Sequence, residues 1–448
     1  MMPRKPDRDI SKAKIPARYV SVLFTVCLFV LMAGTLNRFA KTYYSFLGVG
    51  GRSDFLARTP DRVTQLAHKE TSFWKNAAKG RTIDLIRYCK HIYSNDFFCK
   101  YFFVDLHGGI GKLCGKKTLY NSPHSGRLRT NDNLLFERDD PLSPLSCVQR
   151  PMTSSQLERL RDFKRYLDAR GTKLIYLLPP CREDLGDDTS LDVLYQYKQS
   201  PLYKEKERII EFLKENNISS FDAFEEFAKN TPSINDWFYR TDHHWRIDCV
   251  FEMMPALADH IRGITHLDLP YGKDIFSAER FHEIRHPRFF IGSLGRQAGR
   301  FFVPPDDFIF YLPSFDTDYS IDMKLLDGDT VSFRGKFEET LFDEDIVETS
   351  KLFGTFKYRY YAYCGLDYPQ QHFVNHNVDT GRILIIKDSM GIPVGAFLSF
   401  MFHETMMVDL RYQTSDFSLD RLIDRYQPDI VLIVYRIGDY QDAKFRFL

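Results

Sequence analysis

Two short polar clusters of this 448-residue sequence contain residue types that can do nucleophilic chemistry. The first ends in Ser389, which follows an aliphatic run at residues 383–386 and precedes an apolar segment that opens with Gly391. This pattern predicts a strand, a sharp turn and a helix. A serine on such a turn lies beside unpaired backbone N–H groups that can receive an oxyanion, so Ser389 is a candidate nucleophile. The alternative is that Ser389 only caps the helix, a position that serine favours.

The second cluster, Thr-Asp-His-His-Trp at residues 241–245, offers the other groups that a serine nucleophile needs. Such a serine needs a base with a pKa near neutrality, and the base needs a carboxylate to orient it. Asp242 and His244 are two positions apart, so an extended backbone directs both side chains to the same side. The alternative is an ordinary capping and packing cluster, in which Asp242 caps the apolar helix predicted at residues 249–261.

Strands that alternate with helices predict an α/β fold with a mainly parallel sheet and helices on both faces. The first helix begins at a capping box, a pattern that both Thr153–Gln156 and Ser155–Glu158 fit, and is closed by Gly171. The other predicted elements are strands at residues 173–178, 219–222, 405–410 and 429–435 and helices at residues 203–215 and 418–426. Catalytic groups collect at the carboxyl ends of parallel strands, where Ser389 lies. Residues 264–380 break the alternation and predict an inserted, irregular or β-rich region.

The N-terminal part of the chain predicts a membrane anchor. Residues 19–36 carry no charge, and the charged residues before them are mostly basic, which keeps the N-terminus cytoplasmic. A cleaved signal peptide is the alternative, although no clear cleavage site follows. We therefore expect a cytoplasmic tail (1–18), a transmembrane anchor (19–38), a membrane-proximal segment (39–145) and an extracytoplasmic catalytic domain (146–448). The protein would be a single-pass protein of the cell membrane, with this domain periplasmic or extracellular.

The overall charge is balanced, with 61 Lys+Arg against 60 Asp+Glu. A balanced chain has no global field to attract nucleic acid, so we expect no nucleic-acid partner. Aromatic residues make up 15% of the chain, which permits a large core and could also line a groove for sugars.

Asp-His-His-Trp at residues 242–245, followed far downstream by a strand that ends in Lys-Asp-Ser, resembles the DHHW family. That family is related to the alginate O-acetyltransferase proteins, which are SGNH-hydrolase-like and carry Asp-x-His-Trp before their serine. The resemblance extends over about residues 150–440. It includes residues 174–184, 292–296, 306–308 and 428–435.

The resemblance implies Ser389 as nucleophile, His244 as general base and Asp242 as the group that orients it. His243 fills the variable place in the motif and would have a supporting role. By position, oxyanion donation or support is implied for Met390, Gly292, Ser293 and Gly295. Trp245 would pack beside the site or line the acceptor groove, and Arg296 would bind the acceptor. No asparagine donor for an oxyanion hole can be assigned.

The reaction implied is a two-step acyl transfer that O-acetylates an extracytoplasmic polysaccharide, with no cofactor and no metal. A multi-pass membrane-bound O-acyltransferase would supply the acyl groups. One alternative is a glycan acetylesterase with the same triad, and another is a non-catalytic glycan-binding or assembly subunit. A metallohydrolase is a third alternative, but Asp306, Asp307 and Asp388 show no spacing that would complete a metal site with residues 242–244.

Overall fold

The computed structural model describes residues 100–120, 127–131, 134–138, 151–182, 193–230, 233–265, 267–326, 328–347 and 359–448. The chain divides into two compact units, Met1–Phe103 and Val104–Leu448, and the second contains almost all of these residues. The anchor predicted at residues 19–38 lies outside the described residues. Among the helices that are described, none combines the length and apolar character needed to cross a bilayer.

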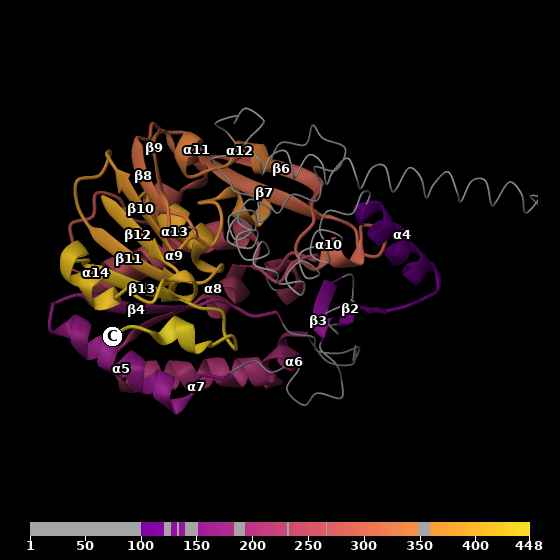
Figure 1. Ribbon diagram of the computed structural model, residues 1–448, viewed down its shortest axis with the longest axis horizontal. Coiled ribbons are helices and arrows are strands. Elements are labelled where there is room, and N and C mark those ends of the chain that lie inside the picture. Colours follow the sequence, from indigo (N-terminus) through magenta and orange to yellow (C-terminus); the bar gives the residue numbers. More distant parts are fainter. Residues whose placement is uncertain are drawn as a thin grey trace, which may run out of the picture. The chain divides into compact units, whose positions relative to one another are not determined.

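An eight-stranded sheet with the order β5-β4-β13-β11-β12-β10-β8-β9 forms the centre of the second unit (Figure 1). Its parallel part consists of β5 (Ser219–Asp222), β4 (Lys173–Leu178), β13 (Ile430–Val434), β11 (Arg382–Lys387) and β12 (Glu404–Val408). Its antiparallel extension consists of β10 (Gln370–Asn375), β8 (Tyr319–Lys324) and β9 (Thr330–Gly335). The predicted mainly parallel sheet is confirmed, and the extension comes from the region predicted to be β-rich.

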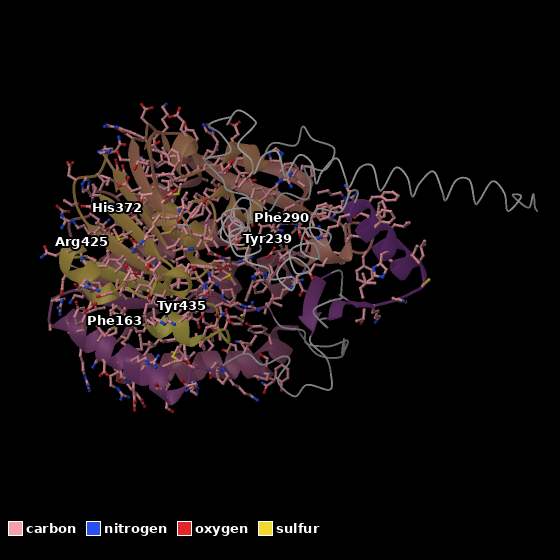
Figure 2. All side chains as sticks on the ribbon, viewed as in Figure 1. Phe163, Tyr239, Phe290, His372, Arg425 and Tyr435 are labelled. Atoms are coloured by element: carbon pink, nitrogen blue, oxygen red, sulfur yellow. The ribbon has the colours of Figure 1, made fainter. Side chains whose placement is uncertain are left out.

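Helices cover both faces of the parallel strands, and successive side chains of each strand point alternately to the two faces. One face packs against α5 (Ser154–Asp168), α7 (Pro201–Glu215) and α14 (Leu419–Tyr426). Phe163 of α5 and Tyr435 after β13 belong to this cluster (Figure 2). The other face packs against α8 (Ala223–Asn230), α9 (Ile247–Ile264) and α13 (Gly391–Leu398). Because both faces are buried, β13 is aliphatic throughout and β11 is aliphatic between its terminal residues Arg382 and Lys387.

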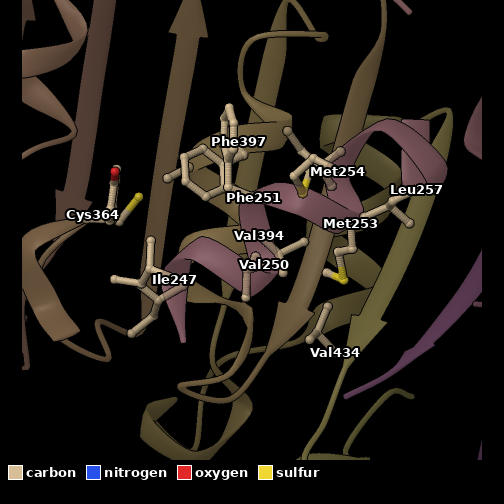
Figure 3. Packing of buried hydrophobic residues seen from close by; sticks show 14 of the residues in the cluster. Ile247, Val250, Phe251, Met253, Met254, Leu257, Cys364, Val394, Phe397 and Val434 are labelled. Carbon is tan, nitrogen blue, oxygen red and sulfur yellow. The ribbon is translucent and has the colours of Figure 1, made fainter. Parts of the chain in front are cut away.

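The central helix of the second face is α9, which begins two residues after Trp245 and is longer than predicted. Its apolar side packs against the sheet and α13 (Figure 3). Phe251 makes an edge-to-face contact with Phe397 of α13, with ring centroids 5.2 Å apart. This packing fixes the start of α9, and therefore the polar loop that precedes it, relative to the helix that follows Ser389.

Local sequence signals explain where several elements begin. Of the two capping boxes that the sequence allowed for α5, the structure shows the first: Thr153 Oγ1 accepts the Gln156 N–H and Gln156 Oε1 accepts the Thr153 N–H. Helix α7 begins at Pro201, two residues earlier than predicted, because Ser200 caps it and proline is favourable at the first helical position.

The remaining described elements lie mainly in the N-terminal part of the second unit and in the β-rich region. They are α4 (Lys100–Leu113), β1 (Thr118–Tyr120), β2 (Arg127–Asn131), β3 (Leu134–Arg138), α6 (Val193–Gln199), β6 (Phe281–Phe290), α10 (Gly295–Ala298), β7 (Asp306–Pro313), α11 (Phe337–Thr340) and α12 (Glu344–Val347). Short 3-10 helices include η6 (Arg359–Ala362), η7 (Leu410–Tyr412) and η8 (Asp442–Phe445). Strands β6 and β7 form a separate antiparallel pair, and the segment between them carries α10.

The turn between β11 and α13 tolerates little extra volume at Gly391. A Cβ added there would lie 2.5 Å from Lys387 Cβ and 3.3 Å from Val434 Cβ. We expect Gly391→Ala to lower the free energy of unfolding by about 1–3 kcal/mol, as overpacking typically does. The matched control is Gly263→Ala in the exposed last turn of α9, where nothing lies within 4 Å of the added Cβ. This control should be neutral or stabilise by about 0.5–1 kcal/mol. Equal effects of the two substitutions in denaturant unfolding would contradict this account.

Candidate active site

The carboxyl ends of the parallel strands bring several polar residues to one edge of the sheet. Arg182 follows β4, Ser389 follows β11, Arg411 follows β12 and Arg436 follows β13. The loop at residues 238–246 also reaches this edge, because His244 of this loop contacts Ser389. A bridge between Phe238 and Trp245 closes this loop at its base.

Three residues predicted to act together are brought together here. Ser389 Oγ lies 2.7 Å from His244 Nε2, across 145 residues of sequence. His244 Nδ1 lies 2.6 Å from Asp242 Oδ1. Asp242 has no exposed surface and His244 is 1% exposed, whereas Ser389 is half-buried. A hydroxyl, an imidazole and a carboxylate in this chain of contacts can move a proton from the hydroxyl to the ring.

Neither capping alternative describes these residues. Helix α13 begins at Gly391 with Met390 at its N-cap, and the Ser389 hydroxyl contacts the His244 ring. Helix α9 has Arg246 at its N-cap, so Asp242 does not cap it. Both side chains are directed at His244 instead.

The Asp242 carboxylate is fully engaged by hydrogen-bond donors. Oδ1 accepts the His244 N–H at 3.0 Å as well as the ring contact, and Oδ2 accepts the Ser293 N–H at 2.7 Å. Burial alone would raise the pKa of Asp242, but the neighbouring His244 and His243 and these hydrogen bonds hold it well below its usual value. A Cβ at Gly292 would lie 2.2 Å from Asp242 Cβ, so only glycine allows this approach. Asp242 is therefore an anion at neutral pH.

The Gly-Ser-Leu-Gly turn at residues 292–295 supports Asp242 instead of forming an open oxyanion hole. The Gly292 N–H donates to Thr241 Oγ1 at 2.9 Å, and the Gly295 N–H donates to the Thr241 carbonyl at 2.8 Å. The Ser293 N–H is the donor to Asp242 described above. The N–H groups of Gly292, Ser293 and Gly295 therefore all donate to acceptors of the protein itself. In this geometry they are not available to an oxyanion.

Asp306 anchors the same loop from β7. Its carboxylate accepts the N–H groups of Arg240 and Thr241 and the Thr241 hydroxyl, at 2.6, 2.9 and 2.6 Å. Burial raises the pKa of Asp306, and these hydrogen bonds oppose the rise. Asp306 belongs to the stretch that carried the family resemblance, but its role in holding the loop could not be inferred from the sequence.

Arg182 also holds the loop, and sequence reasoning missed it. Its guanidinium donates to the carbonyls of Tyr239 (2.7 Å), Arg240 (2.9 Å) and Asp242. Burial lowers the pKa of Arg182 to about 10. Tyr239 packs against Phe290 of β6, with ring centroids 4.6 Å apart (Figure 2). Arg182 belongs to the stretch at residues 174–184 that carried the family resemblance, but nothing in that stretch indicated its role in holding the loop.

The turn that carries Ser389 is held by a second buried carboxylate, Asp388. Its Oδ1 accepts the Met390 N–H at 3.0 Å, so this predicted oxyanion donor is also engaged. Its Oδ2 accepts the Arg436 N–H at 2.8 Å and Lys444 Nζ at 2.7 Å, and Lys444 has no exposed surface. Burial alone would raise the pKa of Asp388, but the charges of Lys444 and Arg411 and these hydrogen bonds hold it well below its usual value.

Aromatic rings surround the His244 imidazole. The ring stacks on Tyr360 with centroids 3.9 Å apart, and His243 lies at the same distance on a tilted plane. His243 Nδ1 lies 3.2 Å from Ser293 Oγ, and burial keeps the pKa of His243 well below its usual value. His243 is therefore a neutral neighbour in a supporting position.

Trp245 does not line an acceptor groove, contrary to one of the expectations for it. The side chain has no exposed surface, its Nε1–H donates to Tyr360 Oη at 3.1 Å, and it packs against Phe227. It is a packing residue behind the site. Arg296 is half-buried on α10, and acceptor binding by this residue stays a prediction.

Asp242, His243 and His244 also carry potential metal-ligand atoms that lie within 4.8 Å of one another. Both ring nitrogens of His244 and both oxygens of Asp242 are already engaged by protein groups. Asp306 and Asp388 are occupied by the loop and by Lys444, respectively. The donor set therefore fits a hydrogen-bonded triad better than a metal site.

The sheet is mainly parallel, and the polar cluster lies at the carboxyl ends of its strands. A family model described as "SGNH hydrolase-like domain, acetyltransferase AlgX" matches residues 129–271, which include Asp242 and His244 but not Ser389. A search of curated proteins finds no match.

Solved structures have a similar fold. PatB1 of Bacillus cereus, in a structure with a sulfonyl adduct, is 17% identical, with a TM-score of 0.54 over 72% of this chain and 99% of that chain. A DHHW family protein from Eubacterium siraeum is 16% identical, with a TM-score of 0.52 over 73% of this chain and 96% of that chain. The resemblance inferred from the sequence is confirmed.

The ion pair between Asp388 and Lys444 gives a stability prediction. Lys444→Met leaves a buried carboxylate unpaired, which typically costs about 3–5 kcal/mol in the free energy of unfolding. Adding Asp388→Asn removes the unpaired charge, so the double variant should recover part of the loss. Chemical denaturation of the three proteins measures these differences.

The pH dependence of that loss tests its electrostatic origin. The pKa of Asp388 in the folded chain lies below the unfolded value of about 3.9, so the pair stabilises the fold above this value and is lost as the pH falls. The difference between wild type and Lys444→Met should therefore be largest near neutrality and should shrink below about pH 4. A difference that stays constant over this range would show that lost packing, not lost charge pairing, is the cause.

Proposed function

We propose that this protein is a membrane-anchored, extracytoplasmic O-acyltransferase that acetylates a cell-surface or secreted polysaccharide through an acyl-serine intermediate. The observation that carries the proposal is the contact of Ser389 Oγ with His244 Nε2 at 2.7 Å, with Asp242 2.6 Å behind the ring. The AlgX-like acetyltransferase domain that residues 129–271 match supports acetyl as the transferred group. The uncharged segment at residues 19–36 supports the anchor.

In the proposed first step His244 takes the proton of Ser389 as the hydroxyl attacks the carbonyl carbon of an acyl donor. Asp242 stabilises the imidazolium that forms. The negative charge that develops on the carbonyl oxygen needs donors, and the backbone N–H of Ser389 has no acceptor within the described residues. This N–H is the donor that we assign, in place of Met390 and the turn at residues 292–295.

The first step ends when His244 gives its proton to the leaving group of the donor, which departs and leaves the acyl-serine. In the second step His244 takes the proton of an acceptor hydroxyl as this hydroxyl attacks the acyl-serine, and returns it to Ser389 Oγ when the ester bond to the serine breaks. A sugar hydroxyl as acceptor gives transfer, whereas water gives hydrolysis. The same three side chains serve both outcomes, and the choice depends on whether the site holds an acceptor and excludes water. We propose a polysaccharide acceptor and a membrane-bound O-acyltransferase as the source of acetyl groups.

Covalent labelling tests the nucleophile. A fluorophosphonate or sulfonyl fluoride should modify Ser389, and Ser389→Ala and His244→Ala should abolish the labelling. Asp242→Asn should slow it by about 10⁴-fold, because the ring would lose its orientation and its counter-charge. Mass spectrometry of peptides from the labelled protein measures both the site and the rate.

The chain offers a matched control for that experiment. Ser320 Oγ lies 2.8 Å from His376 Nε2, a serine–histidine contact near the surface with no catalytic assignment. Ser320→Ala and His376→Ala should leave labelling of Ser389 unchanged. If wild type is not labelled at all while it remains folded, the site is vestigial and a glycan-binding or assembly subunit becomes the better account.

The destination of the acyl group separates transferase from esterase. The full chain would be incubated with an activated acetyl ester and bare oligosaccharide, and separately with acetylated oligosaccharide. We expect acetyl groups on the bare oligosaccharide to outnumber those released as acetate, because the proposed site favours a hydroxyl acceptor over water. Release of acetate from the acetylated oligosaccharide, without any transfer, would favour the glycan acetylesterase.

A further inference from the structure

An apolar stripe on α4 lies exposed at the surface of the second unit. Leu106, Ile110 and Leu113 follow one another at helical spacing and are 44%, 53% and 89% exposed. Phe301, in the turn after α10, is 62% exposed and lines a groove of about 330 Å³ together with these three side chains. Contiguous exposed apolar surface of this kind marks a docking site for a membrane or a protein.

The opposite face of α4 is firmly packed, so the stripe is not the surface of a detached helix. A Cβ at Gly108 would lie 2.1 Å from the Ala298 carbonyl oxygen, and one at Gly111 would lie 2.8 Å from Leu119 Cδ2. Asp105 is buried and accepts the backbone N–H and the guanidinium of Arg300, at 2.6 to 2.9 Å. The glycine face therefore fixes which side of the helix points outwards.

The charged residues around the stripe indicate which kind of partner would bind it. Lys112, Lys116 and Lys117 are exposed at the end of α4. The only acidic residue in residues 104–117, Asp105, is buried and paired with Arg300. An apolar stripe with lysines beside it matches a bilayer surface with anionic headgroups, where acyl chains take the apolar side chains and phosphates take the lysines.

We propose that α4 and Phe301 form a docking surface for the face of an anionic phospholipid bilayer. The surface is joined to the catalytic loop by short contacts. Helix α4 packs on Ala298 of α10, and the Gly295 N–H at the start of α10 donates to the Thr241 carbonyl, next to Asp242. A docked α4 thus holds the catalytic loop at a fixed distance from the bilayer. This inference does not depend on the proposed acyl transfer.

Depth-dependent fluorescence quenching tests the docking surface. Leu113→Trp would be made in the full chain, together with Trp74→Phe to remove one native tryptophan. The other two, Trp237 and Trp245, have no exposed surface and can stay. The protein would be reconstituted in phosphatidylcholine vesicles with and without phosphatidylglycerol, and with brominated phosphatidylcholine as quencher. We expect blue-shifted emission and strong quenching of the introduced indole with phosphatidylglycerol, and weaker quenching without it.

Two further variants make the result decisive. Leu326→Trp, at the 39% exposed turn between β8 and β9, should stay unquenched in the same vesicles. Replacing Lys112, Lys116 and Lys117 with Gln should weaken the phosphatidylglycerol dependence, by about fivefold in partitioning per lysine that contacts the surface. Absence of bromolipid quenching at Leu113→Trp overturns the proposal. Emission that is already blue-shifted in detergent, and does not change when lipid is added, also overturns it, because a protein segment then covers the stripe. Labelling of Ser389 in the same samples reports on the active site separately.

Discussion

The buried anionic carboxylate of Asp242 is the interaction on which the site depends. An unpaired carboxylate in an apolar interior is costly, so its burial is possible only where donors surround it. The donors come from its own loop, through His244, and from the turn after β6, through the Ser293 N–H. Because the two segments must meet to satisfy one charge, the carboxylate fixes both of them. The orientation of the His244 ring follows from that arrangement.

A second buried carboxylate does the same for the nucleophile. Asp388 ties the turn after β11 to the backbone after β13 and to Lys444 in η8. The serine and the imidazole are therefore held by two separate hydrogen-bonded carboxylates, Asp388 and Asp242. Such preorganisation allows a proton to move between them without a large rearrangement of the protein. It also explains why a strongly polar arrangement can persist beside an aliphatic sheet.

Most of the parallel sheet and the three central residues could be predicted from the sequence, because local periodicity and two dense motifs carry that information. Strand β4 was predicted with its observed bounds, and the capping box of α5 is the first of the two that the sequence allowed, at Thr153 and Gln156. The roles of Lys444 and Arg182 could not be predicted. Each is a single charged residue far from its partner in sequence, and only the strand order places it beside that partner.

The Gly292–Gly295 turn shows a different limit. The family resemblance implied oxyanion donation or support by this turn, but the sequence could not show whether a substrate or the protein itself accepts its N–H groups. The groups that accept these N–H groups are those of Asp242 and Thr241, so the turn holds the catalytic loop in place. Trp245 was ambiguous for a similar reason, because an aromatic residue beside a motif can face either the core or the solvent.

The strand order has a consequence for how the chain acquires its structure during synthesis. Strand β13 lies between β4 and β11, and Lys173 of β4 pairs with Ile430 of β13. The edge of β4 that pairs with β13 therefore stays without its neighbour until the ribosome has made Ile430–Val434, far downstream. Contacts between such distant segments form slowly, and an open aliphatic edge is a template for aggregation while it waits. The sheet of a nascent chain is therefore open at its centre until β13 has been made.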